Sequence, residues 1–271
     1  MSKFYPLAAA SLSAALVLCT TAAQATDKFE IQVYEPDMNR PGQFALELHS
    51  NYTLQGHKHP DYPGEVPPHH VGRFTLEPAL GITEWLELGA YLQAMVSPDQ
   101  GAQWAGWKGR AKFVLPTRFT APFFFGINIE VGKVPKQVEE DGWANEFRPI
   151  IGYDDGWVLI DVNPIFGYAL TGPDRFKVDI EPAGKVTINT QKGFAIGAEY
   201  YSGLGMLSRG LSPWARQEHV LFGVLDLKQP KGSSQDAGED GGWELNLGVG
   251  RGLTAATGAQ WIIKAIVGRA F

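Results

Sequence analysis

The chain has 271 residues, with 23 basic and 29 acidic side chains, 32 glycines and 18 prolines. Its net negative charge argues against a nucleic-acid-binding protein, and its one cysteine, Cys19, excludes a fold held together by internal disulfides. Beyond residue 25, no apolar run approaches the roughly 20 residues that a transmembrane helix needs. If the rest of the chain enters a membrane, it must therefore do so as β-strands.

Residues 1–25 have the pattern of a secretory signal peptide. An apolar stretch at 7–18 is followed by Ala23-Gln24-Ala25, a small-x-small cleavage site. The stretch is too short to anchor the chain across roughly 30 Å of hydrocarbon, and a lipoprotein signal at Cys19 is a minor alternative. We expect an exported mature chain of residues 26–271 that forms one domain.

After a leading segment at 26–43, the residues of 44–56 alternate between apolar and polar side chains. Leu46 and Leu48 share one face and His49 lies on the other, as in a strand between two different solvents. The pattern recurs about twelve times, in segments longer than most strands of globular proteins. We predict strands at 44–56, 71–83, 85–96, 104–116, 123–133, 143–153, 157–170, 176–188, 193–202, 218–228, 243–252 and 260–271. The predicted fold is all-β, a single transmembrane antiparallel up-and-down β-barrel.

The last predicted strand, 260–271, is typical of the closing strand of bacterial outer-membrane barrels. Trp261, Ile263 and Phe271 share an apolar face, and Lys264 lies on the opposite face. A C-terminal phenylalanine is the usual last residue of such barrels, so we expect the barrel-assembly machinery to engage this strand. Arg269 falls on the face turned to lipid, which is tolerated only near a headgroup level, where a long cationic side chain can reach water.

The lengths of the connections agree with a barrel whose two ends face different compartments. An even number of strands puts both termini in the periplasm, with short turns there and longer loops outside. The short turns are 83–84, 154–156 and 189–192, and the long loops are 57–70, 97–103, 134–142 and 203–217. The connection at 229–242 departs from this pattern because it should be a periplasmic turn but is long and polar, so we interpret it as a flexible insertion.

Large aromatic residues cluster at the ends of the predicted strands. They are Trp85, Trp104, Trp107, Trp143, Trp157, Trp243, Trp261 and Phe271. Such positions suit the two headgroup levels of a membrane barrel. The alternative is a soluble β-protein that buries these rings in its core.

The side chains opposite the apolar faces should line the lumen. They are Glu47, His49, Arg73, Glu77, Glu87, Tyr91, Lys108, Arg110, Lys112, Asn128, Glu130, Glu146, Arg148, Asp161, Asn163, Lys177, Asp179, Glu181, Lys185, Glu199 and Glu244. Both signs of charge share the interior, because a charge facing mid-bilayer lipid costs about 2–4 kcal/mol. We predict a constriction formed by Glu47, Arg73, Glu77, Lys108, Arg110, Lys112, Glu130, Glu146 and Arg148. The alternative is a network of ion pairs that fills a narrow barrel.

Other chemistry has weak support in the sequence. Four of the six histidines lie in one loop, at His57, His59, His69 and His70. They could capture a transition metal but match no defined motif, so we expect an ordinary polar loop, no metal and no cofactor. The glycines at 248, 250 and 252 resemble a phosphate loop only superficially, because they lie within a strand.

An outer-membrane lipid hydrolase would need a serine and a histidine together on the lipid face near the outer rim. Ser202 and His219 flank one outer loop, but strand parity turns His219 inward. We therefore expect that the protein is not an enzyme.

Four stretches together resemble a family of proteobacterial outer-membrane β-barrels that is related to transporters of the meta-pathway phenol-degradation type. They are IQVYEPDMNRPGQFALELH at 31–49, PDYPGEVPPH at 60–69, EWLELGAYL at 84–92 and NLGVGRGLT at 246–254. The resemblance implies a passive channel for small aromatic or other organic solutes. It carries over no catalytic or ligand-binding residue.

The sequence therefore predicts a protein of the Gram-negative outer membrane that passes small solutes through a charged lumen. Its expected partners are outer-membrane lipid, the assembly machinery and a small-molecule solute, with no nucleic acid. Two alternatives remain open: a plugged barrel with a structural or adhesive role, and the lipid hydrolase.

Overall fold

The computed structural model describes residues 27–140, 142–172, 174–228 and 242–271. The predicted signal peptide and most of the insertion at 229–242 lie outside these residues. The strands are β1 (Phe44–Gly56), β2 (Gly72–Thr83), β3 (Leu86–Ser97), β4 (Gly101–Val114), β5 (Phe123–Lys133), β6 (Trp143–Asp154), β7 (Val158–Asn163), β8 (Phe166–Ala169), β9 (Val178–Ile180), β10 (Ala183–Asn189), β11 (Phe194–Gly203), β12 (Gly205–Met206), β13 (Glu218–Lys228), β14 (Trp243–Gly252) and β15 (Ala259–Ala270). Three short 3₁₀ turns, η1 (Thr117–Phe119), η2 (Leu207–Arg209) and η3 (Trp214–Arg216), lie in the connections. Within the described part of the chain, no helix has the length and apolar character needed to cross a bilayer.

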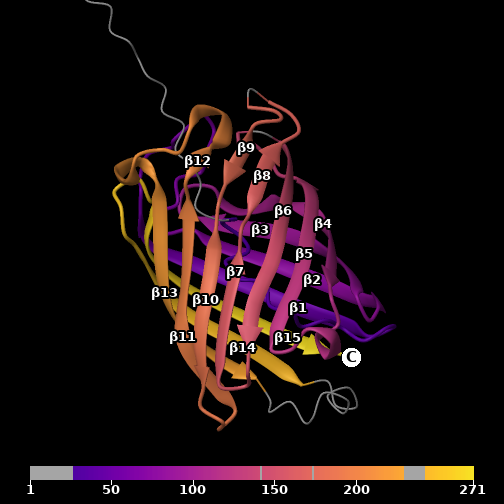
Figure 1. Cartoon of the computed structure of the whole chain (residues 1–271). Helices are drawn as coiled ribbons and strands as arrows, with labels where there is room; N and C mark the ends of the chain where they lie inside the picture. The colour runs from indigo at the N-terminus through magenta and orange to yellow at the C-terminus, as the bar shows by residue number, and fades with distance from the viewer. Residues whose placement is uncertain (1–26, 141, 173, 229–241) are drawn as a thin grey trace, which may run out of the picture.

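The strands form one closed antiparallel barrel (Figure 1). The ring closes where β1 pairs with β15, with Leu48 opposite Val267. We call each full-length strand of the barrel wall a stave. Three staves are each split into two segments, as β7 with β8, β9 with β10 and β11 with β12, so the fifteen segments make a barrel of twelve strands. The predicted strands at 157–170 and 176–188 are two of these interrupted staves, and the predicted fold class is confirmed.

Prolines account for two of the interruptions. Pro164 separates β7 from β8, and Pro182 precedes β10. The pairs on either side of the gap place Pro164 beside Pro149 of β6 on one side and beside Pro182 on the other. Because proline has no N–H to donate, three adjacent staves lose ladder hydrogen bonds at the same level of the wall.

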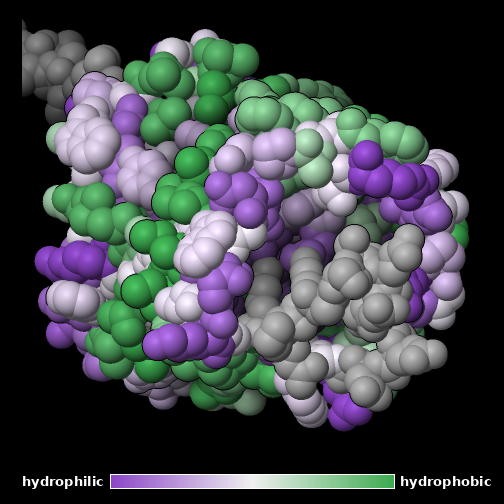
Figure 2. All heavy atoms as spheres, turned by 60° about the horizontal axis from the view of Figure 1, so that its bottom comes forward, coloured by the Kyte–Doolittle hydropathy of each residue, from purple (hydrophilic) through white to green (hydrophobic). Residues whose placement is uncertain are grey.

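The alternation of the sequence becomes the two surfaces of the barrel. On the outside, Leu88 and Val162 are 45% and 46% exposed, whereas Lys112 and Asp161, on the inner face, are 6% and 1% exposed. Figure 2, viewed obliquely from the end that carries the C-terminus, shows apolar residues over much of the outer wall. An apolar surface of this extent around a closed barrel is stable only against acyl chains.

The predicted aromatic girdles lie on this outer surface. Trp157 and Trp243 are exposed at the turn end, and Trp104 is exposed at the loop end, so the rings do not form a soluble core. Arg269, the cation on the lipid face, has its guanidinium carbon 5.3 Å from the ring centres of both Trp243 and Phe271. It therefore lies at the aromatic level, as its sequence position predicted.

The chain before β1 lies inside the barrel. The start of β1 and the end of β15 meet at the turn end, as an even number of strands requires, but residues 27–43 run back through the lumen. We call residues 27–43 the lumenal segment. It begins at Asp27 beside the outer loops and reaches the turn end at Gly42, whose N–H donates to the Gly81 carbonyl at 2.8 Å. The sequence predicted only a leading segment with its start on the periplasmic side, so this placement is a correction.

Candidate functional site in the lumen

The cationic ladder predicted on β4 faces the lumen and is buried. Lys108 pairs with Asp27 and, at 3.2 Å, with Glu130. Lys112 donates to the backbone carbonyl oxygen of Asp37 at 2.7 Å. Two members of the ladder therefore bind the lumenal segment, which supplies partners that strand parity alone could not predict.

The middle cation of the ladder, Arg110, bridges two wall strands. It lies 2.6 Å from Glu77 of β2 and 2.7 Å from Glu87 of β3. The other oxygen of Glu77 lies 2.9 Å from His49 Nε2, and Glu47 lies 3.5 Å from the same nitrogen. A buried charge is tolerated only when it is paired, and these side chains meet that requirement with one another.

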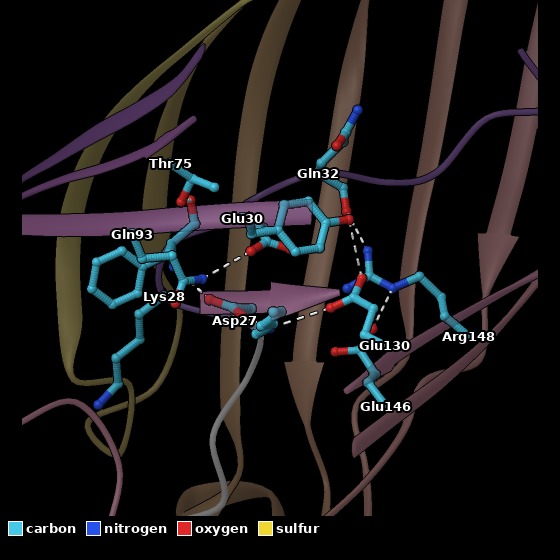
Figure 3. Close-up of polar contacts among 12 residues, drawn as sticks. Asp27, Lys28, Glu30, Gln32, Thr75, Gln93, Glu130, Glu146 and Arg148 are labelled. Carbon is cyan, nitrogen blue, oxygen red and sulfur yellow. Dashed lines mark hydrogen bonds and ion pairs between the residues drawn. The ribbon is translucent and has the colours of Figure 1, made fainter. Parts of the chain in front are cut away.

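The remaining members of the predicted constriction also face inward. Arg148 is fully buried; its Nε donates to Glu146 at 2.7 Å and its Nη1 to the Gln32 carbonyl at 3.1 Å (Figure 3). Arg73 donates to Thr53 at 3.1 Å, and its guanidinium carbon lies 5.9 Å from the ring centre of Phe29. All nine residues of the predicted constriction therefore face the lumen. The sequence did not predict that the lumenal segment lies between them.

A second charge network lies across the lumen. Lys185 of β10 lies 2.8 Å from both Glu35 of the lumenal segment and Asp226 of β13, and 3.5 Å from Glu199 of β11. Lys264 of β15 pairs with Glu199. Asp226 and Lys264 were absent from the predicted lumen list, although parity puts Lys264 on the inner face.

Two members of the predicted lumen list lie at the ends of the barrel. Lys177 is in the connection between β8 and β9, where it pairs with Asp174. Glu244 is exposed near the turn end of β14. Both positions lie at strand ends, where alternation no longer separates lumen from solvent.

One side of the lumen is apolar, which the alternation of the sequence did not predict. Ile31 and Val33 of the lumenal segment pack against a cluster on the wall that includes Tyr201 and Phe222. On β14, Gly248 and Gly250 leave the room that the Phe222 ring occupies, since a Cβ at Gly250 would lie 2.5 Å from it. These glycines therefore thin the wall, as predicted.

Hydrogen bonds to its backbone hold the lumenal segment in place. Asn163 of β7 accepts from the Tyr34 N–H at 2.7 Å and donates to the Tyr34 carbonyl at 3.2 Å, as a neighbouring strand would. Lys264 donates to the Ile31 carbonyl at 2.8 Å. Gln93 donates to the Glu30 side chain at 2.9 Å (Figure 3). The described residues 27–43 take no part in the sheet itself.

A cavity of about 860 Å³ opens at the loop end and reaches down to Asp27, Lys108 and Glu130. We call it the vestibule. Its acidic lining residues are Asp27, Asp61, Glu65, Glu130, Glu139, Glu140, Glu146, Asp174, Asp179, Glu181 and Glu218; the basic ones are Lys28, Lys108, Arg209 and Arg216. The excess of carboxylates gives the outer mouth a negative potential, which attracts cations.

The pKa of Glu139, in the loop that follows β5, is raised to about 7. Burial is the main cause, and the nearby negative charge of Asp27 raises it further. The charge of the vestibule therefore changes near neutral pH.

Two of the four loop histidines make hydrogen bonds to other groups. His57 Nε2 lies 3.1 Å from the Ala255 carbonyl, and His70 Nδ1 lies 3.1 Å from the Tyr52 hydroxyl. Within the described residues, three side chains that could bind a metal lie close together: ligand atoms of Glu47, His49 and Glu77 are within 4.8 Å of one another. Hydrogen bonds among these three and Arg110 already satisfy most of their ligand atoms.

Ser202 and His219 lie directly opposite each other on β11 and β13. His219 shares its parity with the exposed Leu221, so the inward orientation predicted for it was wrong. The two side chains are nevertheless engaged elsewhere: Ser202 donates to the Pro182 carbonyl at 3.1 Å, and His219 contacts Tyr200 and Gln217 through its two ring nitrogens. The serine–histidine hydrogen bond that a hydrolase needs is not formed.

Comparisons with solved structures identify similar barrels. The chain is similar to the COG4313 outer membrane channel from Pseudomonas putida F1, with 11% identity, a TM-score of 0.57, and coverage of 89% of this chain and 100% of that one. It is also similar to the KdgM porin, with 11% identity, a TM-score of 0.51, and coverage of 84% and 99%. The fold is that of outer-membrane β-barrel channels.

No protein-family model matches the sequence, and no curated protein matches it. At 11% identity the structural likeness establishes the fold, and the apolar belt of the twelve-stranded barrel places the chain in the outer membrane of a Gram-negative cell.

Proposed function

We propose that this protein is a passive outer-membrane channel for small solutes and that the lumenal segment is its gate. The observation that carries the proposal is the vestibule, which leads from the outer loops into the lumen. The lumen is filled by the lumenal segment, which is not part of the barrel wall. A solute can reach Lys108 and Glu130 from outside, and from Asp27 at that level the segment runs to Gly42 at the turn end.

The contacts of the segment support a gate better than a permanent plug. Its backbone is bound by side chains such as Asn163 and Lys264, and neither bond is part of the sheet. When the segment leaves, the wall keeps its own ion pairs, including Arg110 with Glu77 and Arg148 with Glu146. Part of the charged lining therefore stays paired around an open path.

We assign to this channel small aromatic or other organic solutes, the class implied by the resemblance to barrels of the phenol-degradation type. The apolar wall around Phe222 and the charged wall around Arg110 support this class. A solute with an apolar body and a polar group can contact both walls at once. The predicted constriction residues keep their role in this proposal as the lining of the path beside the segment.

The test locks the segment in place. A variant with Glu30→Cys and Gln93→Cys is bridged with a short, reducible bifunctional thiol reagent, because these two side chains already meet at 2.9 Å. In planar bilayers we expect the bridged protein to conduct little and the reduced protein to recover. Each single-cysteine variant, treated in the same way, is the matched control. Deleting residues 28–38 should give a larger, steady conductance.

A plugged structural barrel is the second candidate, because side chains from several sides of the barrel bind the lumenal segment. It predicts no flux in liposome-swelling assays for the wild-type protein, and none for the double-cysteine variant, whether bridged or reduced. Flux only from the deletion variant would support this candidate over the gated channel.

A further inference from the structure

We propose that the lumen contains a subsite for one neutral phenolic ring and that the side chain of Tyr34 occupies it in this structure. Tyr34 is 3% exposed, and three cations surround its ring. The charged atoms of Arg148, Lys112 and Arg110 lie 4.6, 5.5 and 5.9 Å from the ring centre. Cations placed around one ring attract its π-electrons, so this position favours an aromatic π-face over an aliphatic group.

The far end of the subsite selects a hydroxyl group. The hydroxyls of Tyr34 and Tyr91 are hydrogen-bonded, and the Tyr91 hydroxyl donates to Glu130 Oε1 at 3.4 Å. Glu130 is 1% exposed and also accepts from Asn128 at 2.7 Å. Because the Tyr91 hydroxyl gives its proton to Glu130, the Tyr34 hydroxyl is the donor to Tyr91. A neutral phenol can donate in the same way, whereas a carboxylate or phenolate has no proton to give.

Two of the cations have N–H groups without a hydrogen-bond partner while the Tyr34 side chain occupies the subsite. Arg110 Nη1 and Arg148 Nη2 are buried and have no hydrogen-bond partner among the residues that the structure describes. A buried N–H without a partner is costly. A solute whose ring carries a second oxygen could supply the missing acceptor, which Tyr34 cannot do.

Occupancy of the subsite is coupled to the position of the lumenal segment. Tyr34 packs on Phe124 and Ile150, and its backbone is bound by Asn163. A solute ring that replaces the Tyr34 side chain removes one of the main buried contacts of the segment. Entry of a phenol therefore favours the open lumen, and in this respect the inference rests on the proposed channel function.

The first test restores the lost ring with a small molecule. Tyr34→Ala is purified in detergent and titrated calorimetrically with p-cresol, which is the tyrosine side chain itself. We expect p-cresol to bind and to raise the thermal transition of the variant. Toluene, 4-methylcyclohexanol and p-toluate should bind about tenfold or more weakly, since each lacks the hydroxyl, the π-face or neutrality.

Phe124→Ala is the matched control, because it opens a cavity in the same apolar cluster without removing Tyr34 from its cations. There p-cresol should bind no better than toluene. Equal binding of all four compounds to Tyr34→Ala, or no binding of p-cresol to a folded Tyr34→Ala protein, would overturn the phenolic subsite.

A second test needs no folded Tyr34→Ala protein. Val33→Cys places a thiol on the buried segment of an otherwise wild-type barrel, and p-cresol should raise its rate of maleimide labelling severalfold more than toluene does. Equal rates with both compounds would overturn the subsite. Solute flux is measured separately in liposomes: p-cresol binding without flux would leave the subsite intact and overturn the channel. Flux of p-cresol without selective binding would leave the channel intact and overturn the subsite.

Discussion

Glu139 makes the charge of the vestibule sensitive to pH. Burial and the charge of Asp27 raise the pKa of its carboxyl to about 7, so the group is mostly neutral at pH 6 and mostly charged at pH 8. We predict that cation selectivity, measured as the reversal potential in a salt gradient, increases from pH 6 to pH 8. Glu139→Gln should remove most of this increase, and the neighbouring exposed Glu140→Gln is the control.

The same pKa shift has a consequence for stability. From the ordinary glutamate pKa of 4.5 up to about 7, the folded barrel keeps a proton that the unfolded chain has released. Stability from this side chain is therefore lost as pH rises through that interval. Glu139→Gln should flatten the pH dependence of the thermal transition between pH 5 and pH 7, and an unchanged slope would contradict the assignment.

Gly81 allows the lumenal segment to enter the barrel at the turn end. Its carbonyl accepts from the Gly42 N–H, and a Cβ on Gly81 would collide with the backbone carbonyls of Asn39 and Arg40. We predict that Gly81→Val displaces this end of the segment and raises the open probability in single-channel recordings. Gly109→Val is the matched control, because a Cβ there meets nothing within 4 Å. Similar recordings from both variants would argue against a gate at this rim.

The lumenal segment depends on Asn163 as its substitute strand neighbour. Asn163→Ala removes two buried hydrogen bonds to Tyr34, which together are worth about 2 kcal/mol. We predict that the equilibrium shifts toward the displaced segment by roughly thirtyfold. The measurement is the rate at which a cysteine at Val33 reacts with maleimide, compared with the rate in the parent protein. Thr187→Ala, which changes a buried lumen-facing side chain of β10 instead, should leave the rate nearly unchanged.

The strands were predictable from sequence because each strand meets two solvents. Leu88 and Glu87 differ in exposure simply because one faces lipid and the other faces the lumen, so a period of two is visible in a short window. The boundaries of β5, β13 and β14 agree with the prediction to the residue. The staves split near Pro164 and Pro182 were predicted as continuous because a proline on the lipid face leaves the alternation intact.

The contents of the lumen were not predictable in the same way. On β13, Val220, Phe222 and Val224 face inward and are as apolar as the residues that face lipid, so parity gave no signal there. Their inward orientation is stable because Ile31 and Val33 cover them. Contact between segments so far apart in sequence leaves no trace in local periodicity. Local patterns therefore predicted the wall and its charges but not the chain between them.

At the scale of the whole molecule, the barrel encloses a segment that contacts most of its staves. Lys112 of β4, Lys185 of β10 and Lys264 of β15 each bind it, from different sides of the ring. Reversing the charge of Lys108, Arg110 and Lys112 together would therefore leave Asp27, Glu77 and Glu87 facing buried like charges. We expect such a triple variant to disrupt folding before it alters ion selectivity, so single neutralisations are the better probes of the constriction.

The path of the lumenal segment determines where its beginning lies relative to the membrane. At the loop end, Asp27 pairs with Lys108 and Lys28 pairs with Glu65. The turn that contains Lys192 lies at the opposite end. Without the predicted signal peptide the chain has no cysteine, so single cysteines can report each end. We predict that a membrane-impermeant maleimide labels Lys28→Cys and Gln100→Cys on intact cells. It should label Lys192→Cys only after the outer membrane is permeabilised. If Lys192→Cys were labelled on intact cells and Gln100→Cys only after permeabilisation, the assigned orientation of the barrel would be reversed. If Lys28→Cys alone were protected, the lumenal path would be contradicted, because this residue would then lie away from the outer mouth.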